Sequence, residues 1–285
     1  MRLALLQMTS GISAADNARV IADAMEEAAD GGAQVLLTPE MALLLDRDRE
    51  RADVRAENDY PEIAKLREKA RALGIWLHLC LPVAQGDKRR NRTLVIAPDG
   101  TIAARYDKIH LFDVDLSTGE SWRESRVYES GEGPVLAQTA DVPTGLSICY
   151  DIRFPALYRA LAEDGAQLLT IPAAFTVPTG RAHWHVLARA RAIETGCFVA
   201  APAQVARHED GRETFGHSLV VDPWGHVLLD MEERCGVGFA DIELAAVERA
   251  RTQVPALANA RPIGEVRATA QTNCPLAPPP VKDPP

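Results

Sequence analysis

The hydrophobic positions of the chain follow two patterns: short apolar runs, and segments in which apolar residues recur every three or four positions. The short runs predict buried strands at residues 3–8, 35–37, 75–81, 146–149, 168–172 and 197–203. The helical spacing predicts helices at residues 16–30, 63–73, 155–163 and 181–195. Because strands that are apolar along their whole length are buried on both faces, helices should cover the sheets that they form.

Two predicted hairpins interrupt this alternation. The turn Pro98-Asp99-Gly100 joins residues 93–97 to residues 101–106, and Asp222-Pro223-Trp224-Gly225 joins residues 219–221 to residues 227–229. An eightfold α/β barrel fits less well, since each of its strands is followed by a helix. The pattern favours an α/β fold of mixed sheets with outer helices, such as a four-layer α-β-β-α sandwich.

The length and the end of the chain set the expected domain organisation. The 285 residues fit one domain, which we expect to span residues 1–270. Residues 275–285 contain six prolines, a composition that favours an extended, solvated tail.

Charge and cysteine usage exclude some classes of protein. A net charge of −9 argues against a general nucleic-acid binder, and we expect the most basic run, residues 88–92, to be a solvated loop. No apolar run is long enough to span a membrane, and the first residues are too short a run for a signal peptide. The five cysteines include no CxxC pair, which leaves a zinc knuckle or a redox motif unsupported. We therefore expect a cytoplasmic location with reduced thiols.

Three polar residues stand where predicted buried strands end, which is where α/β folds place their sites. Glu40 follows residues 35–37, Lys108 follows the first hairpin, and Cys149 precedes a predicted helix. A cysteine can attack a carbonyl carbon once a base such as Glu40 takes its proton. Lys108 and the backbone N–H of Tyr150 could meet the resulting oxyanion, and a helix N-terminus favours a thiolate. Taken singly, the three are more often a surface carboxylate, a surface lysine and a packing cysteine.

Other candidate residues lead to weaker hypotheses. His183 and His185 could suggest a metal pair, but two helical positions point about 200° apart, so we expect no metal site. A Cys–His protease would leave the segments around Glu40 and Lys108 unexplained. Arg153 could bind a substrate carboxylate or form a structural salt bridge. The remaining cysteines are interpreted as packing residues: Cys80, Cys197, Cys235 and Cys274.

Longer segments around the three residues resemble the nitrilase, or carbon–nitrogen hydrolase, superfamily. They are Leu37-Thr38-Pro39-Glu40, Tyr106-Asp107-Lys108-Ile109-His110-Leu111-Phe112-Asp113 and Ser147-Ile148-Cys149-Tyr150-Asp151-Ile152-Arg153-Phe154-Pro155. The resemblance places the family's Glu–Lys–Cys triad on Glu40, Lys108 and Cys149, and its second glutamate on Glu124. It implies the α-β-β-α sandwich, no metal or organic cofactor, and a homodimer that pairs through helices near the cysteine.

Further segments, among them residues 179–184 and Gly216-His217-Ser218, resemble the branch of omega-amidases and deaminated glutathione amidases. Two departures bear on substrate and assembly. His185 stands where many members of the branch carry Glu, and the chain after Pro262 lacks the usual aromatic ending.

The sequence therefore predicts a hydrolase that cleaves a non-peptide C–N bond of a small amide bearing a carboxylate. The reaction would pass through a thioester on Cys149 and release ammonia and an acid. We expect Tyr150, Arg153 and His185 to contact substrate. An N-carbamoyl amine hydrolase or a nitrilase with the same triad is the alternative enzyme, and a non-catalytic binding protein is the alternative from another class.

Overall fold

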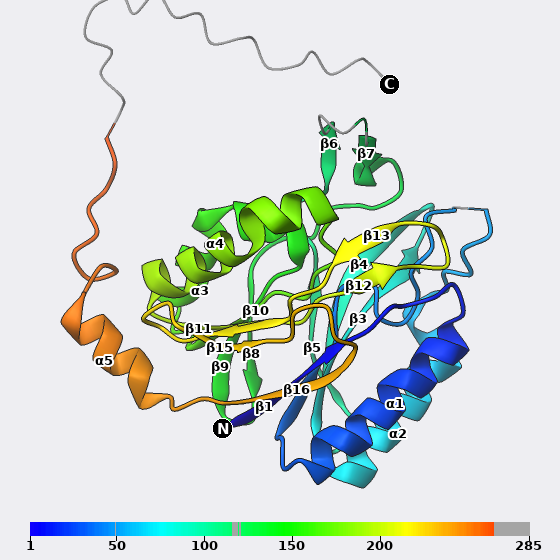
Figure 1. Ribbon diagram of the computed structural model, residues 1–285, viewed down its shortest axis with the longest axis horizontal. Helices are drawn as coiled ribbons and strands as arrows, with labels where there is room; N and C mark the ends of the chain where they lie inside the picture. Colours follow the sequence, from blue (N-terminus) through cyan, green and yellow to red (C-terminus); the bar gives the residue numbers. More distant parts are fainter. Residues whose placement is uncertain (49, 116–118, 120, 265–285) are drawn as a thin grey trace, which may run out of the picture.

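The computed structural model describes residues 1–264 apart from residues 49, 116–118 and 120 (Figure 1). Within this range, two six-stranded mixed sheets form the centre of the molecule. The first sheet has the order β16-β1-β2-β3-β4-β5, with β1 (Arg2–Gln7), β2 (Val35–Leu37), β3 (Trp76–Gln85), β4 (Lys88–Ile96), β5 (Ile102–Asp107) and β16 (Gly236–Asp241). The second has the order β15-β14-β11-β10-β9-β8, with β8 (Val135–Thr139), β9 (Val142–Leu146), β10 (Leu168–Thr170), β11 (Phe198–Ala201), β14 (Leu219–Val221) and β15 (Val227–Asp230).

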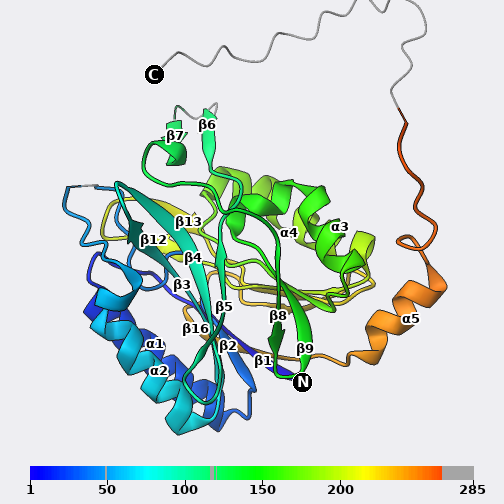
Figure 2. The same cartoon turned by 180° about the vertical axis from the view of Figure 1, so that it is seen from behind.

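Helices cover the outer face of each sheet. Helices α1 (Ala14–Asp30) and α2 (Pro61–Leu73) lie on the first sheet, and α3 (Pro155–Glu163) and α4 (Val177–Thr195) lie on the second (Figures 1 and 2). The predicted four-layer α-β-β-α sandwich is thereby confirmed. Smaller elements complete the described chain: β6 (Asp113–Asp115), β7 (Ser121–Arg123), β12 (Val205–Arg207), β13 (Glu213–Phe215), α5 (Ala245–Gln253) and the 3-10 helices η1 (Glu57–Asp59), η2 (Glu124–Arg126) and η3 (Cys149–Arg153).

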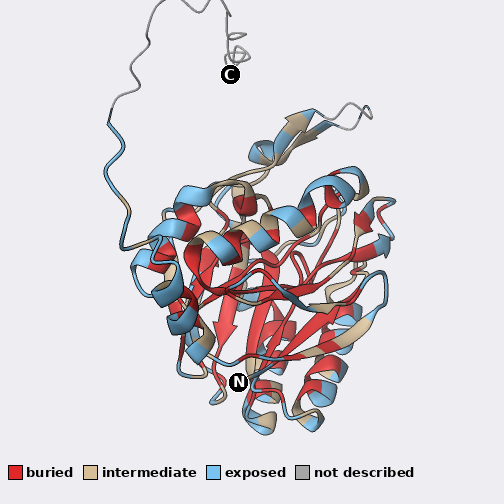
Figure 3. Ribbon diagram, turned by 60° about the vertical axis from the view of Figure 1, so that its left-hand side comes forward, coloured by how far each residue is buried: buried red, intermediate tan, exposed pale blue. Residues whose placement is uncertain are grey.

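The layers explain why the strands are apolar on both faces. Along β1, Leu3 and Leu5 point between the sheets, where Phe198 of the second sheet meets them. The intervening Ala4 and Leu6 point to the other side, into the cluster under α1 and α2. Because successive side chains of a strand alternate between faces, each layer interface receives its own apolar set. Figure 3 shows the buried strands between helices whose outer sides are exposed.

The basic run at residues 88–92 is not the solvated loop that we predicted. It begins β4, which pairs with β3 in antiparallel register from Gln85↔Lys88 to Leu77↔Ile96 around a turn containing Gly86, whose φ of 60° favours glycine. The ladder hydrogen bonds come from the backbone, so flanking charges do not prevent the strand. Within it Asn91 is fully buried, although its neighbours in the sequence are basic.

Several further boundaries differ from the prediction. The strand predicted at residues 146–149 is β9, which ends at Leu146, so that Cys149 begins η3. Cys80 and Cys197 are buried as expected, whereas Cys235 is exposed and not a packing residue. Cys274 and the proline-rich tail lie outside the described residues. Among those described, no helix has both the length and the apolar character needed to cross a membrane.

Candidate active site

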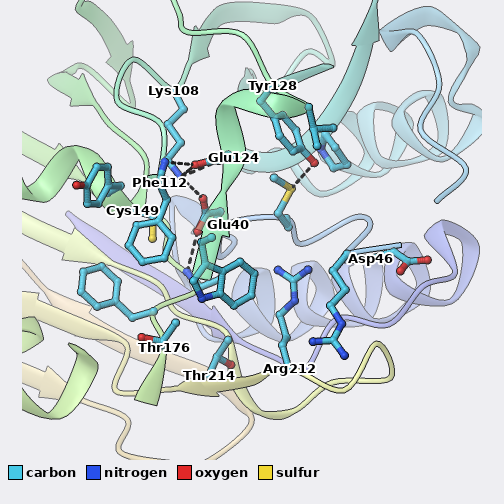
Figure 4. Close-up of a pocket in the computed structure, with 18 of the residues that line it drawn as sticks. Glu40, Asp46, Lys108, Phe112, Glu124, Tyr128, Cys149, Thr176, Arg212 and Thr214 are labelled. Atoms are coloured by element: carbon cyan, nitrogen blue, oxygen red, sulfur yellow. Dashed lines mark hydrogen bonds and ion pairs between the residues drawn. The ribbon is translucent and has the colours of Figure 1, made fainter. Parts of the chain in front are cut away.

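The residues singled out at strand ends meet in one pocket that opens along the seam between the two sheets (Figure 4). Glu40 follows β2 and Lys108 follows β5, both from the first sheet, whereas Cys149 follows β9 of the second. Glu124, at the start of η2, lines the same pocket. Residues that follow the carboxyl ends of strands from both sheets thus supply the site.

Cys149 lies at a sharp bend between strand and 3-10 helix. Its φ is 47°, a left-handed conformation that residues other than glycine rarely adopt. The Cys149 N–H donates to the Pro172 carbonyl at 2.9 Å, which joins the bend to the chain after β10. The first hydrogen bond of the η3 turn is donated by the Asp151 N–H to the Ile148 carbonyl. The Tyr150 N–H, one position earlier, has no acceptor among the described residues, as is usual at a helix start.

Glu40 is 5% exposed and is held by three donors. Its Oε1 accepts from Asn91 Nδ2 at 2.7 Å and from Lys108 Nζ at 2.9 Å. Its Oε2 accepts from the Ala174 N–H at 3.0 Å, so a residue following β10 fixes the other side of the carboxylate. These bonds fix the direction in which the carboxylate faces the pocket.

Lys108 is 2% exposed and stands between two carboxylates. Besides Glu40, its Nζ donates to Glu124 Oε1 at 3.1 Å and Oε2 at 2.9 Å. Burial alone would lower the pKa of Lys108, but the charges of Glu124 and Glu40 outweigh it and hold the pKa well above the usual value. The side chain is therefore a fixed cation at neutral pH.

Asn91 belongs to this site although sequence reasoning missed it. Its Nδ2 donates to Glu40 Oε1 at 2.7 Å and to Glu124 Oε1 at 3.3 Å, so it bridges the two carboxylates on the side away from solvent. Glu124 is further fixed by the Phe112 N–H, which donates to Oε2 at 2.7 Å. One signal was available in the sequence: Asn91 is an uncharged amide among basic residues. In a strand, alternation of side chains between the two faces would have directed this amide inward.

The surroundings of Cys149 favour the neutral thiol. Burial raises its pKa well above the usual value, and the charge of Glu40 together with a thiol hydrogen bond to it raises the pKa further. Lys108 opposes these effects without reversing the direction. This differs from the thiolate expected at a helix N-terminus, because desolvation and a nearby carboxylate outweigh the short η3 turn. The proton therefore has to leave during the attack, and Glu40 is beside it.

Asp151 ties the cysteine bend to the lysine segment. One oxygen accepts from the Ile148 N–H at 2.9 Å and from the Tyr106 hydroxyl at 2.6 Å. The other accepts from the His110 backbone N–H at 3.0 Å and lies 2.7 Å from His110 Nδ1. Asp151 is fully buried, so the bonds are made away from water.

Tyr150 and Arg153 form one wall of the pocket. The Arg153 guanidinium lies over the rings of Tyr150 and Phe175, at 5.8 and 5.5 Å from their centroids, and contacts His183 Nδ1 at 3.2 Å. No Asp or Glu of the described chain forms an ion pair with it. The alternative that Arg153 forms a structural salt bridge thus has no support in the described structure. The positive charge of Arg153 is available to the pocket.

The structure does not bring His185 to this pocket. Its ring lies 2.9 Å from an Asp230 oxygen on β15, and His185 is not among the described residues that line the site. The face of α4 that carries His185 is directed toward β15 and the chain before β14 rather than toward Cys149. The structure therefore gives no support to the expected contact between His185 and substrate, which stays a prediction.

Comparison with known proteins supports this description of the fold. Residues 2–252 match the family described as carbon–nitrogen hydrolase. The chain is 38% identical over 265 residues to a deaminated glutathione amidase of Yersinia enterocolitica, covering 91% of this chain and 92% of that protein.

Two solved structures are similar to it. One is the NitFhit protein of Caenorhabditis elegans, with a TM-score of 0.85 and 36% identity over 91% of this chain and 65% of that longer one. The other is an amidase of Nesterenkonia sp., with a TM-score of 0.76 and 29% identity over 90% of this chain and 98% of that one. In that structure, of a glutamate-to-glutamine mutant, acrylamide has added to the active-site cysteine.

The sandwich is thus that of the nitrilase-type enzymes. The chain belongs to the carbon–nitrogen hydrolase family, and it is an amide-cleaving enzyme of that family.

Proposed function

We propose that Cys149 is the nucleophile, Glu40 the general base, and Lys108 the charge that stabilises the oxyanion. The supporting observation is that the Lys108 ammonium is held between two carboxylates in the pocket that contains the thiol. In the first step Sγ bonds to the amide carbon while the thiol proton passes to Glu40. Negative charge then develops on the amide oxygen, within reach of Lys108 and the free Tyr150 N–H.

Glu40 returns its proton to the leaving nitrogen, the C–N bond breaks, and ammonia departs from a thioester on Cys149. Glu40 next takes a proton from water as the water oxygen attacks the thioester. The C–S bond breaks, the thiol regains that proton, and the acid is released. Glu124 and Asn91 keep the lysine and the base in position throughout and exchange no proton. The cycle uses groups of this chain and one water molecule, so the proposal needs no cofactor.

The proposed substrate is a small amide that carries a carboxylate. Arg153 supports this, since its guanidinium faces the pocket from the turn that holds the nucleophile and has no carboxylate partner in the described structure. A planar guanidinium binds a carboxylate through two parallel hydrogen bonds. The relative in Yersinia enterocolitica is a deaminated glutathione amidase, which is consistent with an acidic amide.

Acyl-enzyme trapping tests the triad. Wild-type protein mixed with an omega-amide of a dicarboxylic acid and quenched in acid should carry the acyl mass on Cys149 and release ammonia. Cys149→Ala and Glu40→Gln should give neither product, whereas Cys235→Ala, which removes an exposed thiol, should behave as wild type. A normal adduct in Glu40→Gln would move the base elsewhere, and turnover by Cys149→Ala would overturn the nucleophile.

A paired-substrate comparison tests the carboxylate. Wild type should prefer the carboxylate-bearing amide over its carboxylate-free analogue, and Arg153→Ala should lose that preference mainly through KM. Arg123→Ala is the matched control, because Arg123 lines the same pocket but is already paired with Asp115 at 2.7 Å. A wild-type preference for neutral amides, nitriles or carbamoyl amines would refute the substrate while leaving the triad intact.

We also propose a cytoplasmic homodimer. Large apolar side chains are exposed on one side of the molecule, with Val186 and Ile193 on α4 and Trp224 and Leu228 on the β14–β15 hairpin. Exposed apolar groups that gather on neighbouring elements are typical of an interface between subunits.

A further inference from the structure

A second cluster of potential ligands lies outside the catalytic pocket. His185 is on α4, His217 precedes β14, and Asp230 ends β15. His185 Nε2 lies 2.9 Å from Asp230 Oδ2, and His217 Nδ1 lies 2.9 Å from Asp230 Oδ1. One donor atom from each residue falls within 4.8 Å of the other two. Three separate elements therefore direct two imidazole nitrogens and a carboxylate at one point.

We propose that His185, His217 and Asp230 bind a divalent transition-metal ion, with Zn²⁺ as the representative. Imidazole nitrogens suit zinc, cobalt and nickel, whereas magnesium and calcium prefer sites made of oxygen alone. In a single protomer the three side chains are 35%, 21% and 28% exposed, so water can reach the remaining coordination positions there. Two imidazoles, one carboxylate and water make a set that zinc accepts.

The surroundings hold the ligands in place. The Glu232 N–H donates to Asp230 Oδ1 at 2.8 Å, which fixes the carboxylate. The His217 ring stacks on Phe215, with centroids 4.4 Å apart. The His217 backbone has a φ of 57°, and its carbonyl accepts from Trp184 Nε1 at 2.7 Å. Supporting contacts of this kind orient metal ligands and strengthen their binding.

Metal binding requires one rearrangement of protons. Without metal, each imidazole N–H can point at an Asp230 oxygen. To coordinate, the same nitrogen must present its lone pair, so the proton moves to the other ring nitrogen through solvent and the imidazole stays neutral. Both other nitrogens belong to partly exposed rings, so this exchange needs no opening of the fold.

A bound ion would clamp α4 to the β14–β15 hairpin. Helix α4 and the strand that precedes the hairpin, β13, both reach the pocket wall, which Thr179 on α4 and Thr214 on β13 line. The Phe215 N–H, beside His217 in space, donates to the carbonyl of the pocket residue Phe175 at 3.0 Å. The ion's role is structural, because its ligands do not line the pocket that holds Cys149.

Calorimetric titration with Zn²⁺ tests the site in the full chain. The background is Cys149→Ala, Cys235→Ala and Cys274→Ala, which removes thiols that could compete for the metal. We expect one micromolar site, and Co²⁺ at that site should show visible absorption bands. His217→Ala and Asp230→Asn should each weaken binding at least about tenfold. At a hundredfold excess of Zn²⁺ over Kd, Tm should rise by about 5 °C.

Two further variants keep the test decisive. His185→Gln preserves α4 and should still lose affinity, so a failure of His217→Ala to fold does not remove the comparison. His226→Ala is the matched control, because His226 pairs with Asp222 at 3.0 Å but has no second histidine beside it. Absence of zinc binding, unchanged affinity in the ligand variants, or an equal loss in His226→Ala would overturn the proposal. None of these results depends on amide cleavage.

Discussion

At the scale of single residues, the environment of Cys149 keeps the thiol neutral at rest and places a base beside it for the attack. The thiol is buried, and the carboxylate of Glu40 beside it raises its pKa rather than lowering it. A resting thiolate would also attract adventitious electrophiles, so a thiol that ionises only during attack restricts reaction to molecules that reach the base. The pocket therefore favours proton transfer coupled to substrate binding.

The first prediction concerns this ionisation. Because burial and Glu40 raise the pKa of Cys149 above its usual value, the neutral thiol should persist through neutral pH and thiolate should form only in alkaline solution. Thiolate absorbance near 240 nm, as the difference between wild type and Cys149→Ala, measures it. In Glu40→Gln, loss of the negative charge should move the midpoint to lower pH. A wild-type thiolate signal at pH 7 would contradict the direction.

The second prediction concerns the backbone at the same residue. A φ of 47° disfavours every residue that has a Cβ, by roughly 1–2 kcal/mol. Cys149→Gly should therefore have a higher Tm than Cys149→Ala, the reverse of the usual order for these residues. Thermal unfolding of both inactive variants tests this, with Cys80→Gly and Cys80→Ala in the regular strand β3 as the control pair. An Ala variant at position 149 more stable than the Gly variant would refute the argument.

The third prediction concerns Asn91. Replacing it with Leu removes the donor shared by Glu40 and Glu124 and leaves Lys108 as the remaining side-chain donor to the two oxygens. A hydrogen bond to a charged group is worth about 1.5–3 kcal/mol, so kcat should fall by roughly 10- to 100-fold when the base loses this donor. Thr93→Val, two positions along the same buried face of β4, is the control for packing. Equal effects of the two variants on kcat would show that Asn91 only fills space.

At the scale of elements, the site depends on how the chain segments after the strands are joined. Asp151 connects η3 to the segment after β5, and through them the nucleophile to the lysine. Both segments are short and irregular, so side-chain hydrogen bonds substitute for a continuous ladder. Their relative position is thus set by one carboxylate.

Asp151→Asn is the fourth prediction. An amide cannot accept at both positions that the carboxylate serves, so the segments around Cys149 and Lys108 should shift relative to each other. A displacement of about 1 Å can cost on the order of 100-fold in rate, and kcat should fall more than KM changes. Asp222→Asn, which alters a carboxylate of the β14–β15 turn, is the control. A variant with wild-type kcat would show that the backbone alone sets the geometry.

The elements also show what sequence reasoning can reach. Long periodic segments such as α1 and α4 were predicted within a few residues, because burial of one face fixes their period. The short strands β6, β12 and β13 were not predicted, since they lack the apolar runs that indicated the equally short β2 and β14. Cys149 was expected at the end of a strand and instead begins η3, because its left-handed φ bends the chain.

For the site, the local segments were sufficient to select Glu40, Lys108, Glu124 and Cys149, which the structure brings to one pocket. Asn91 was missed because its meaning comes from alternation along a strand whose charged residues suggested a loop. His185 was expected near the substrate but lies beside Asp230, because the orientation of α4 about its axis depends on packing against β15 and the chain before β14. The orientation of α4 is not encoded within a few neighbouring residues.

At the scale of the whole molecule, the apolar side formed by α4 and the β14–β15 hairpin gives the fifth prediction. Val186→Glu combined with Leu228→Glu places charges on side chains that are 68% and 45% exposed, so folding should persist while the proposed dimer dissociates. Light scattering coupled to size exclusion measures the mass. Val20→Glu, on α1 of the other helical layer and 45% exposed, is the control and should leave the mass unchanged. A monomeric wild type would refute the proposed dimer.

Because the site takes residues from both sheets, turnover requires that the two sheets are packed against each other. The first sheet carries the base and the cation, and the second carries the thiol, so neither half contains a working set. In a denaturant titration, turnover should vanish as soon as the sheets separate, even while helices on each half still contribute to the circular dichroism. Two fragments divided between β7 and β8 should each be inert and should recover turnover only on reassociation. The chain could then report the assembly of its own halves through the ammonia that it releases.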